Sequence, residues 1–173
     1  MNGALKARLL DLDQTWSRRL QTNSQTQLLR TLGNLFAHSG DSWFVLIALG
    51  LGWWLGNSDW KTLALTMAIG VLVTALAVMI IKLLVRRERP PGEWGELYRK
   101  TDPHSFPSGH AARAVMLALI ALALGHAWLG ITLCIWAPFV CLARVAMGVH
   151  YLSDILAGVL IGAAIGLTIA WLV

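Results

Sequence analysis

Three polar clusters interrupt a sequence that is otherwise strongly apolar. The first is KLLVRRERPPG at residues 82 to 92, the second is PSGH at residues 107 to 110, and the third is ARVAMGVHYLSD at residues 143 to 154. Charged side chains are costly inside a membrane and tend to mark functional sites there. The clusters are therefore candidate parts of one functional site.

The first two clusters offer cations and a helix start. Lys82 and Arg89 are seven residues apart, so they would share one face of a helix that continued to the following proline. Ser108 and Gly109 fall in the first turn of a predicted helix, whose unpaired backbone N–H groups favour an anion. His110 beside them can give a proton to a departing oxygen. The plainer interpretation of the first cluster is a set of interfacial anchors, and that of the second is an ordinary capped helix start.

The third cluster offers a histidine with a carboxylate behind it. His150 and Asp154 are four residues apart, so the carboxylate can fix the tautomer of the ring and leave its other nitrogen as a nucleophile or base. Arg144 adds a third cation. Together the clusters predict a site for a tetrahedral oxyanion, and phosphate fits best because guanidinium groups match its oxygens. No residue set has metal-ligand spacing, so we expect no metal or other cofactor, with Lys and Arg neutralising the anion.

The elements that must position these residues are membrane helices. The chain has 173 residues, of which 57% are hydrophobic and 13% charged, and its mean hydropathy is +0.62. This composition predicts an all-α, polytopic membrane bundle of about five transmembrane helices. The apolar segments are residues 42–58, 62–81, the run that follows PSGH, the run after the break at 125–128, and residues 155–173. An up-and-down arrangement brings all three clusters to one membrane face.

The first forty residues differ from the rest of the chain. They mix Leu with Arg, Asp and Gln at helical spacing, which favours amphipathic helices at the membrane interface. We therefore divide the chain into an interfacial segment, residues 1–40, and a transmembrane catalytic domain, residues 41–173. Cys134 and Cys141 are predicted to be packing residues without a disulfide. We expect membrane lipids and no nucleic acid as partners, and the oligomeric state stays open.

The three clusters resemble the signature of the type 2 phosphatidic acid phosphatase superfamily, written K-x6-RP, PSGH and SR-x5-H-x3-D. Here it stands as KLLVRRERP, PSGH and ARVAMGVHYLSD, with every spacing kept. The one departure is Ala143, where the family usually carries Ser and thus a further hydroxyl donor to the phosphate. The resemblance covers residues 42 to 173.

The resemblance implies a role for each matched residue. His150 attacks phosphorus, is oriented by Asp154 and forms a phosphohistidine, while His110 protonates the leaving group and then acts as base for water. No metal takes part. Five further residues are implied to bind the phosphate: Lys82, Arg89, Ser108, Gly109 and Arg144.

The resulting hypothesis is a phosphatase that hydrolyses the phosphomonoester or pyrophosphate of a lipid phosphate. Phosphatidic acid, phosphatidylglycerol phosphate, undecaprenyl pyrophosphate and lipid A 1-phosphate all fit. The alternatives are a vanadium haloperoxidase-like enzyme, and a transporter or proton relay that uses the same polar residues. Trp94, Tyr98, Arg99 and Lys100 either contact a headgroup or anchor their loop.

We expect a multi-pass protein of the bacterial inner, or plasma, membrane. The resemblance favours an active site on the periplasmic face. The distribution of Lys and Arg favours the cytoplasmic face instead, because Lys61 alone falls on the side opposite the predicted site.

Overall fold

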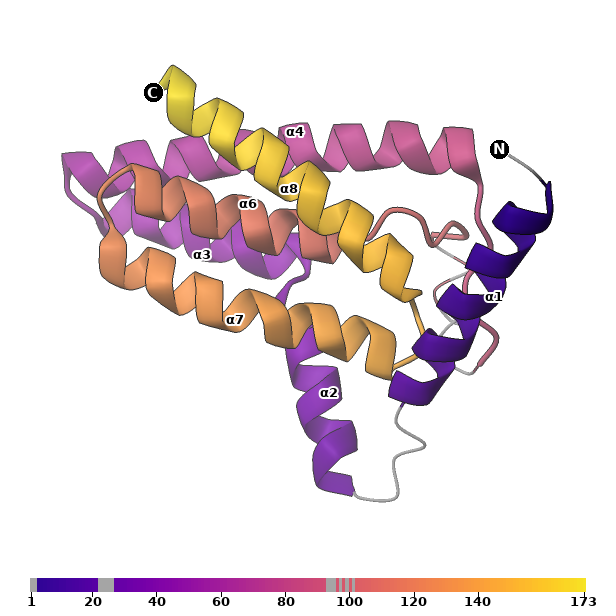
Figure 1. Ribbon diagram of the computed structural model, residues 1–173. Helices are drawn as coiled ribbons and strands as arrows, with labels where there is room; N and C mark the ends of the chain where they lie inside the picture. Colours follow the sequence, from indigo (N-terminus) through magenta and orange to yellow (C-terminus); the bar gives the residue numbers. More distant parts are fainter. Residues whose placement is uncertain (1–2, 22–26, 93–95, 97, 99, 101) are drawn as a thin grey trace.

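The computed structural model describes residues 3–21, 27–92, 96, 98, 100 and 102–173. In this part of the chain the regular elements are helices, so the predicted all-α class is confirmed (Figure 1). They are α1 (Gly3–Leu20), α2 (Gln27–Ser39), α3 (Ser42–Leu55), α4 (Ser58–Val85), α6 (Gly109–Ala123), α7 (Ala127–Ala146) and α8 (Leu152–Leu172).

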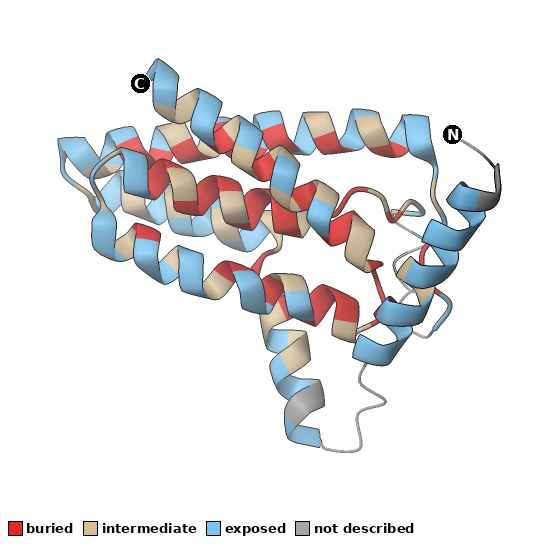
Figure 2. Cartoon of the chain, in the orientation of Figure 1, coloured by how far each residue is buried: buried red, intermediate tan, exposed pale blue. Residues whose placement is uncertain are grey.

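Helix α6 forms the centre of the bundle. It packs against α8, α7 and α4, and most of its residues are buried (Figure 2). Met116, Leu117 and Ile120 join Leu63 and Met67 of α4 in the main apolar core. By contrast, the outward faces of the surrounding helices carry exposed large apolar side chains, such as Leu72, Leu76 and Leu160. An apolar exterior around a buried core is expected of a protein whose solvent is lipid.

The contact between α6 and α8 depends on small residues. Gly158, Gly162 and Gly166 recur every four residues on the face of α8 that meets α6. A Cβ atom at Gly158 or Gly162 would collide with the backbone oxygens of Ser108 or Ala112. Such small-residue stripes let two membrane helices approach closely. The stripe therefore holds the start of α6, which carries the second motif, against α8, which carries the end of the third.

The five predicted apolar segments all form helices, although not all are equally long. Among the described residues, α4, α7 and α8 are long and apolar enough to cross a membrane. The apolar parts of α2 and α3 meet at a bend of 59° and give a fourth candidate if they form one broken span. Helix α6 has 15 residues, fewer than the roughly 20 that a free-standing span needs. The multi-pass bundle is confirmed, with three to four spans by length and composition.

The N-terminal helices contact the end of the bundle that carries the three motifs. Helix α1 lies across this end (Figure 1), where Ser17 Oγ accepts a hydrogen bond of 2.9 Å from the backbone N–H of Leu152. Helix α2 packs on α7, with the rings of Phe36 and Phe139 5.2 Å apart. The interfacial location of these helices and the division at residue 40 stay predictions.

Candidate active site

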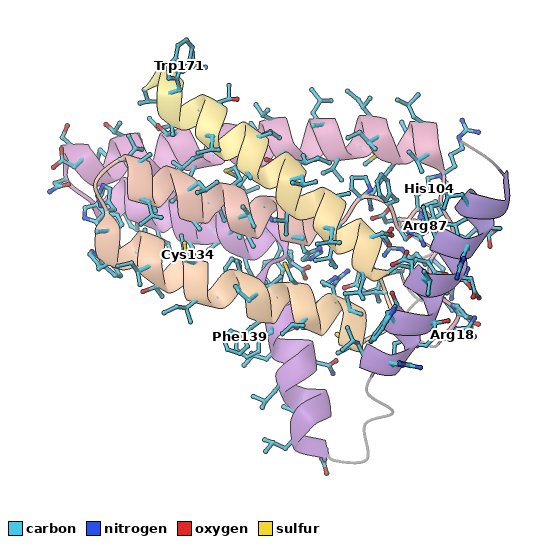
Figure 3. The ribbon with its side chains drawn as sticks, viewed as in Figure 1. Arg18, Arg87, His104, Cys134, Phe139 and Trp171 are labelled. Atoms are coloured by element: carbon cyan, nitrogen blue, oxygen red, sulfur yellow. The ribbon has the colours of Figure 1, made fainter. Side chains whose placement is uncertain are left out.

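A cavity of about 260 Å³ lies where α4 ends and α6 begins. Figure 3 shows Arg87 and His104 at this end of the bundle, beside α1, whereas Trp171 lies at the far end. Six of the eight predicted site residues line the cavity: Lys82, Arg89, Gly109, His110, Arg144 and His150. Ser108 and Asp154 are fully buried and hydrogen-bonded to each other through their backbones, the Ser108 N–H donating to the Asp154 carbonyl at 2.9 Å.

The first motif does not lie on one helix, contrary to the spacing argument. Helix α4 ends at Val85, and Arg86 takes a left-handed conformation (φ 50°, ψ 39°) that turns the chain. The next residues are extended, with Glu88 in an isolated antiparallel bridge to His104. Lys82 and Arg89 therefore meet because the chain folds back and not because they share a helical face.

A carboxylate already bridges these two cations. Asp102 Oδ2 accepts hydrogen bonds from Lys82 Nζ and, at 2.8 Å, from Arg89 Nη2. The backbone oxygen of Asp102 also accepts a bond of 2.7 Å from Arg89 Nε. Burial alone would raise the pKa of Asp102, but the hydrogen bond to Lys82 and the positive charges of Lys82 and Arg89 lower it below the ordinary value. The geometry around Oδ2 thus suits an anionic oxygen.

The second motif forms the start of α6. Ser108 is the N-cap, and its hydroxyl accepts a long hydrogen bond of 3.4 Å from the N–H of Ala111. Gly109 and His110 are the first helical residues and line the cavity, so the N-terminus of the helix faces it. Ser108 was expected either to cap the helix or to bind the phosphate, and the described residues show it as the helix cap.

The third motif closes through a turn at the end of α7. Gly148 adopts a left-handed conformation (φ 68°), and the N–H groups of Val149 and His150 donate back to the carbonyl of Arg144. Such a turn after a helix favours glycine because an added Cβ would be strained. It places His150 and Arg144 together at the cavity, and His150 itself lies in the connection before α8 instead of on a helix.

The ring of His150 is buried among cations. Its Nε2 lies 3.5 Å from Nη1 of Arg89, and a guanidinium can only donate, so Nε2 carries the lone pair and Nδ1 the proton. Burial and then the positive charges of Arg144, Arg89 and Lys82 lower the pKa of His150 well below 6.5. The imidazole is therefore neutral near pH 7, with its lone pair directed to the cations.

Asp154 lies behind this ring but is held by other groups. Its Oδ2 is 3.6 Å from His150 Nδ1, beyond hydrogen-bond distance, and accepts a bond of 2.9 Å from the N–H of Tyr151. Its Oδ1 accepts a bond of 2.8 Å from Arg87, which also pairs with Asp13 of α1 at 2.7 Å. The carboxylate is thus fixed near Nδ1 without a direct bond in this state.

Comparison with known proteins decides the family. The sequence model of the PAP2 superfamily matches residues 59–173. The chain belongs to the PAP2 superfamily. The family prediction made from the three motifs is therefore confirmed, and with it the expectation of an enzyme of the phosphatase class.

Two PAP2 relatives illustrate the match in sequence. The decaprenylphosphoryl-5-phosphoribose phosphatase of Mycobacterium tuberculosis is 33% identical over 136 residues, which cover 75% of this chain and 72% of the relative. The lipid A 4′-phosphatase of Bacteroides thetaiotaomicron is 31% identical over 121 residues, which cover 62% of this chain and 54% of the relative.

Two solved PAP2-like structures share the fold. A transmembrane PAP2 type phosphatidylglycerolphosphate phosphatase from Bacillus subtilis aligns with a TM-score of 0.76 at 22% identity, over 99% of this chain and 87% of that one. LpxE of Aquifex aeolicus aligns with a TM-score of 0.70 at 23% identity, over 90% of this chain and 92% of that one. The first alignment includes the N-terminal helices, so these are part of the shared fold.

Tyr98 of this PAP2 protein contacts two of the cations that line the cavity. Its hydroxyl accepts a bond of 3.1 Å from Arg144 Nη1, and its ring lies 4.7 Å from the Arg144 guanidinium and 5.4 Å from that of Arg89. It therefore lies at the site, whereas Lys100 is exposed. Trp94 and Arg99, predicted alongside them, lie outside the described residues.

Several residues at the cavity were not predicted from the motifs. Asp102 and Arg113 line the cavity, and Arg87 binds Asp154. The sequence offered a signal for Arg113, because it is a charged residue inside an apolar run. It also offered one for Arg87, which lies in the first cluster but could equally be an interfacial anchor. Asp102 and Asp41, a partner of His110, carry no signal in spacing, since their contacts join distant segments.

Proposed function

We propose that this PAP2 protein is a membrane phosphatase that hydrolyses the phosphomonoester or pyrophosphate of a lipid phosphate. The observation that carries the proposal is the cavity at the end of the bundle, in which three buried cations face two imidazoles. A tetrahedral dianion fits this charge. The names of the matched relatives, which are lipid phosphate phosphatases, support the same substrate class.

The phosphoryl oxygens would bind to the cations and the helix start. Lys82 and Arg89 already hold one anionic oxygen, that of Asp102, and a substrate oxygen would replace it. Among the described residues, Nε of buried Arg144 has no hydrogen-bond partner, so this N–H is available to the phosphate. The N–H of Gly109 and the N-terminus of α6 complete the cradle. Ser108 would contribute by fixing this helix start.

The chemistry would then proceed in two steps. The Nε2 lone pair of His150 attacks phosphorus while the bond to the leaving oxygen breaks, and His110 gives that oxygen its proton. The phosphohistidine is stabilised by Asp154, whose negative charge lies near Nδ1. Water then attacks phosphorus and loses a proton to His110, the P–N bond breaks, and phosphate leaves with His150 neutral again.

Substrate identity and sidedness belong to the same proposal. The lipid A and polyprenyl substrates named for the relatives, like phosphatidic acid and phosphatidylglycerol phosphate, would place a phosphate at the membrane surface, where we expect this cavity to lie. We place the active site on the periplasmic face of a bacterial inner membrane. A thiol-reactive probe that cannot cross membranes tests this in intact cells, with a cysteine introduced at exposed Lys100.

The test is phosphate release by the purified protein in detergent micelles with excess EDTA. We expect release from at least one member of a panel of phosphatidic acid, phosphatidylglycerol phosphate, undecaprenyl pyrophosphate and lipid A, and its loss in His150→Ala. His126→Ala, at the far end of the bundle where its ring packs on Trp60, is the matched control and should keep full activity. Release that persists in His150→Ala would overturn the nucleophile assignment.

Further assays exclude the alternative functions. We expect inhibition by vanadate, which imitates the five-coordinate phosphorus of the reaction. A protein that halogenates with peroxide and vanadate, or that moves ions across proteoliposomes without releasing phosphate, would contradict the phosphatase proposal.

A further inference from the structure

The second histidine of the cavity also has a carboxylate partner. Nε2 of His110 lies 2.7 Å from Oδ1 of Asp41, although the two residues are 69 positions apart in the sequence. The other carboxylate oxygen lies 3.2 Å from Nδ1 of His38. Contacts to both oxygens fix the plane of the Asp41 carboxylate.

The Asp41 carboxylate contacts His110 instead of capping its own helix. It occupies the N-cap position of α3, where an aspartate side chain normally accepts a hydrogen bond from the first turn of the helix. Here the side chain makes no such bond. The carboxylate is turned away from its own helix and toward the ring of His110 on α6.

The junction that carries Asp41 is fixed against α6 and α7. Arg113, three residues after His110, donates from Nε at 3.0 Å and also from Nη2 to the carbonyl of Gly40. Gly40 lies so close that a Cβ there would be 3.2 Å from Cδ2 of His110 and 3.3 Å from Val140. On α7, Trp136 Nε1 donates at 3.0 Å to Ser39 Oγ. These contacts hold the bend between α2 and α3 in a single place.

His110 lies between Asp41 and the cavity. His110 lines the cavity and Asp41 does not, so we expect the carboxylate to act on a ligand through the imidazole. Since Nε2 is in contact with Asp41, Nδ1 is the ring nitrogen left for the ligand.

We propose that Asp41 is a positioning residue that holds His110 by its Nε2–H, stabilises its protonated form and directs Nδ1–H to the leaving oxygen. This inference rests on the proposed function, since it names the group that makes His110 a proton donor. A carboxylate on the far side of an imidazole fixes its tautomer and supports its positive charge, as in other acid–base pairs.

The test compares Asp41→Asn with wild type on two leaving groups. Release from short-chain phosphatidic acid, whose alkoxide must be protonated, should fall about 10- to 100-fold in kcat. Release from 4-nitrophenyl phosphate, whose phenolate leaves without a proton, should fall less than about 3-fold. The matched control is Asp59→Asn, an exposed aspartate at the far end of α4, which should behave as wild type. Equal losses on both substrates would overturn the proposal.

A second arm asks whether Asp41 acts through His110. Adding Asp41→Asn to His110→Asn should change kcat by less than about 2-fold, because the two residues work as one unit. If Asp41→Asn lowered kcat as much in the His110→Asn background as in wild type, Asp41 would have a separate structural role. That result would contradict the proposal.

A third arm does not depend on turnover. In protein labelled with 15N-histidine, Nε2 of the His110 ring should carry a proton in wild type, and its resonance should shift in Asp41→Asn but not in Asp59→Asn. An unshifted resonance refutes the pairing. If wild-type protein released no phosphate from any lipid, the proposed function would fail first, and the proton-donor role of the pair would fail with it.

Discussion

The cavity has two carboxylate–imidazole pairs that differ in how the chain makes them. His150 and Asp154 are four residues apart, on one turn and the helix start that follows it. His110 and Asp41 are 69 residues apart, on α6 and at the bend before α3. The local pair is separated by 3.6 Å, whereas the distant pair is in hydrogen-bond contact at 2.7 Å. Proximity in sequence therefore does not predict which pair is closer in the fold.

The two pairs also differ in their electrostatic surroundings. His150 is surrounded by Arg89, Arg144 and Lys82, and its aspartate is shared with Arg87, so the ring is kept neutral as a nucleophile should be. Burial and the positive charge of Arg144 also disfavour a proton on the ring of His110, but its contact with Asp41 at 2.7 Å opposes them. The two imidazoles thus differ in direct carboxylate contact, which is present at His110 and absent at His150.

Removing each imidazole should give the largest effects and separate the two roles. His150→Asn should lower kcat more than about 1,000-fold on both phosphatidic acid and 4-nitrophenyl phosphate, since no nucleophile remains. His110→Asn should lower kcat about 100- to 1,000-fold on phosphatidic acid and only about 10-fold on 4-nitrophenyl phosphate. If both variants showed the same dependence on the leaving group, the assigned roles would be wrong.

Asp154→Asn should have the next largest effect. The amide cannot balance the positive charge of the proposed phosphohistidine, and it leaves half-buried Arg87 with Asp13 as its remaining carboxylate, so kcat should fall about 100-fold. Steady-state kinetics checks this, with exposed Asp11→Asn on α1 as the control. An Asp154→Asn enzyme with wild-type kcat would show that the local pair has no catalytic role.

Asp102→Asn should improve substrate binding, whereas the preceding variants impair catalysis. The carboxylate occupies the position between Lys82 and Arg89 that a phosphoryl oxygen would take, so substrate must displace it. Neutralising it should lower the KM for phosphatidic acid and the inhibition constant of vanadate about 3-fold. A raised KM would instead make Asp102 a support of the two cations.

The smallest expected effect is a lowered pKa of His150 in the free protein. Because its folded-state pKa is lowered, the neutral ring should persist as the pH falls through 6.5, and protonation should begin only below that value. Carbon-13 NMR of labelled histidines in the free protein measures this, with His150→Asn to assign the signal. A midpoint at or above 6.5 would contradict the neutral nucleophile.

The sequence predicts the local parts of this site and not the distant ones. The spacing within each motif correctly places His150, Arg144 and the helix start at His110, since turns and helices of a few residues position them. It fails for Lys82 and Arg89, because a left-handed residue ends α4 between them. It cannot find Asp41, whose contact with His110 exists only once α3 and α6 have packed together.

Helix lengths show a similar limit. Hydropathy finds the apolar segments correctly but does not show that α6 is a short, buried central helix or that α2 and α3 join at a bend. These properties depend on which face each helix buries. The Gly stripe of α8, for example, acquires its meaning only from the backbone of α6 opposite it.

A structure of the protein with bound orthovanadate tests the central claim most directly. Vanadium should be bonded to Nε2 of His150, with Nδ1 of His110 on the opposite, leaving-group side, Lys82, Arg89 and Arg144 around the equatorial oxygens, and Asp102 displaced. Vanadate bound away from His150, or both imidazoles on the same side of the vanadium, would contradict a site in which one histidine attacks and the other protonates.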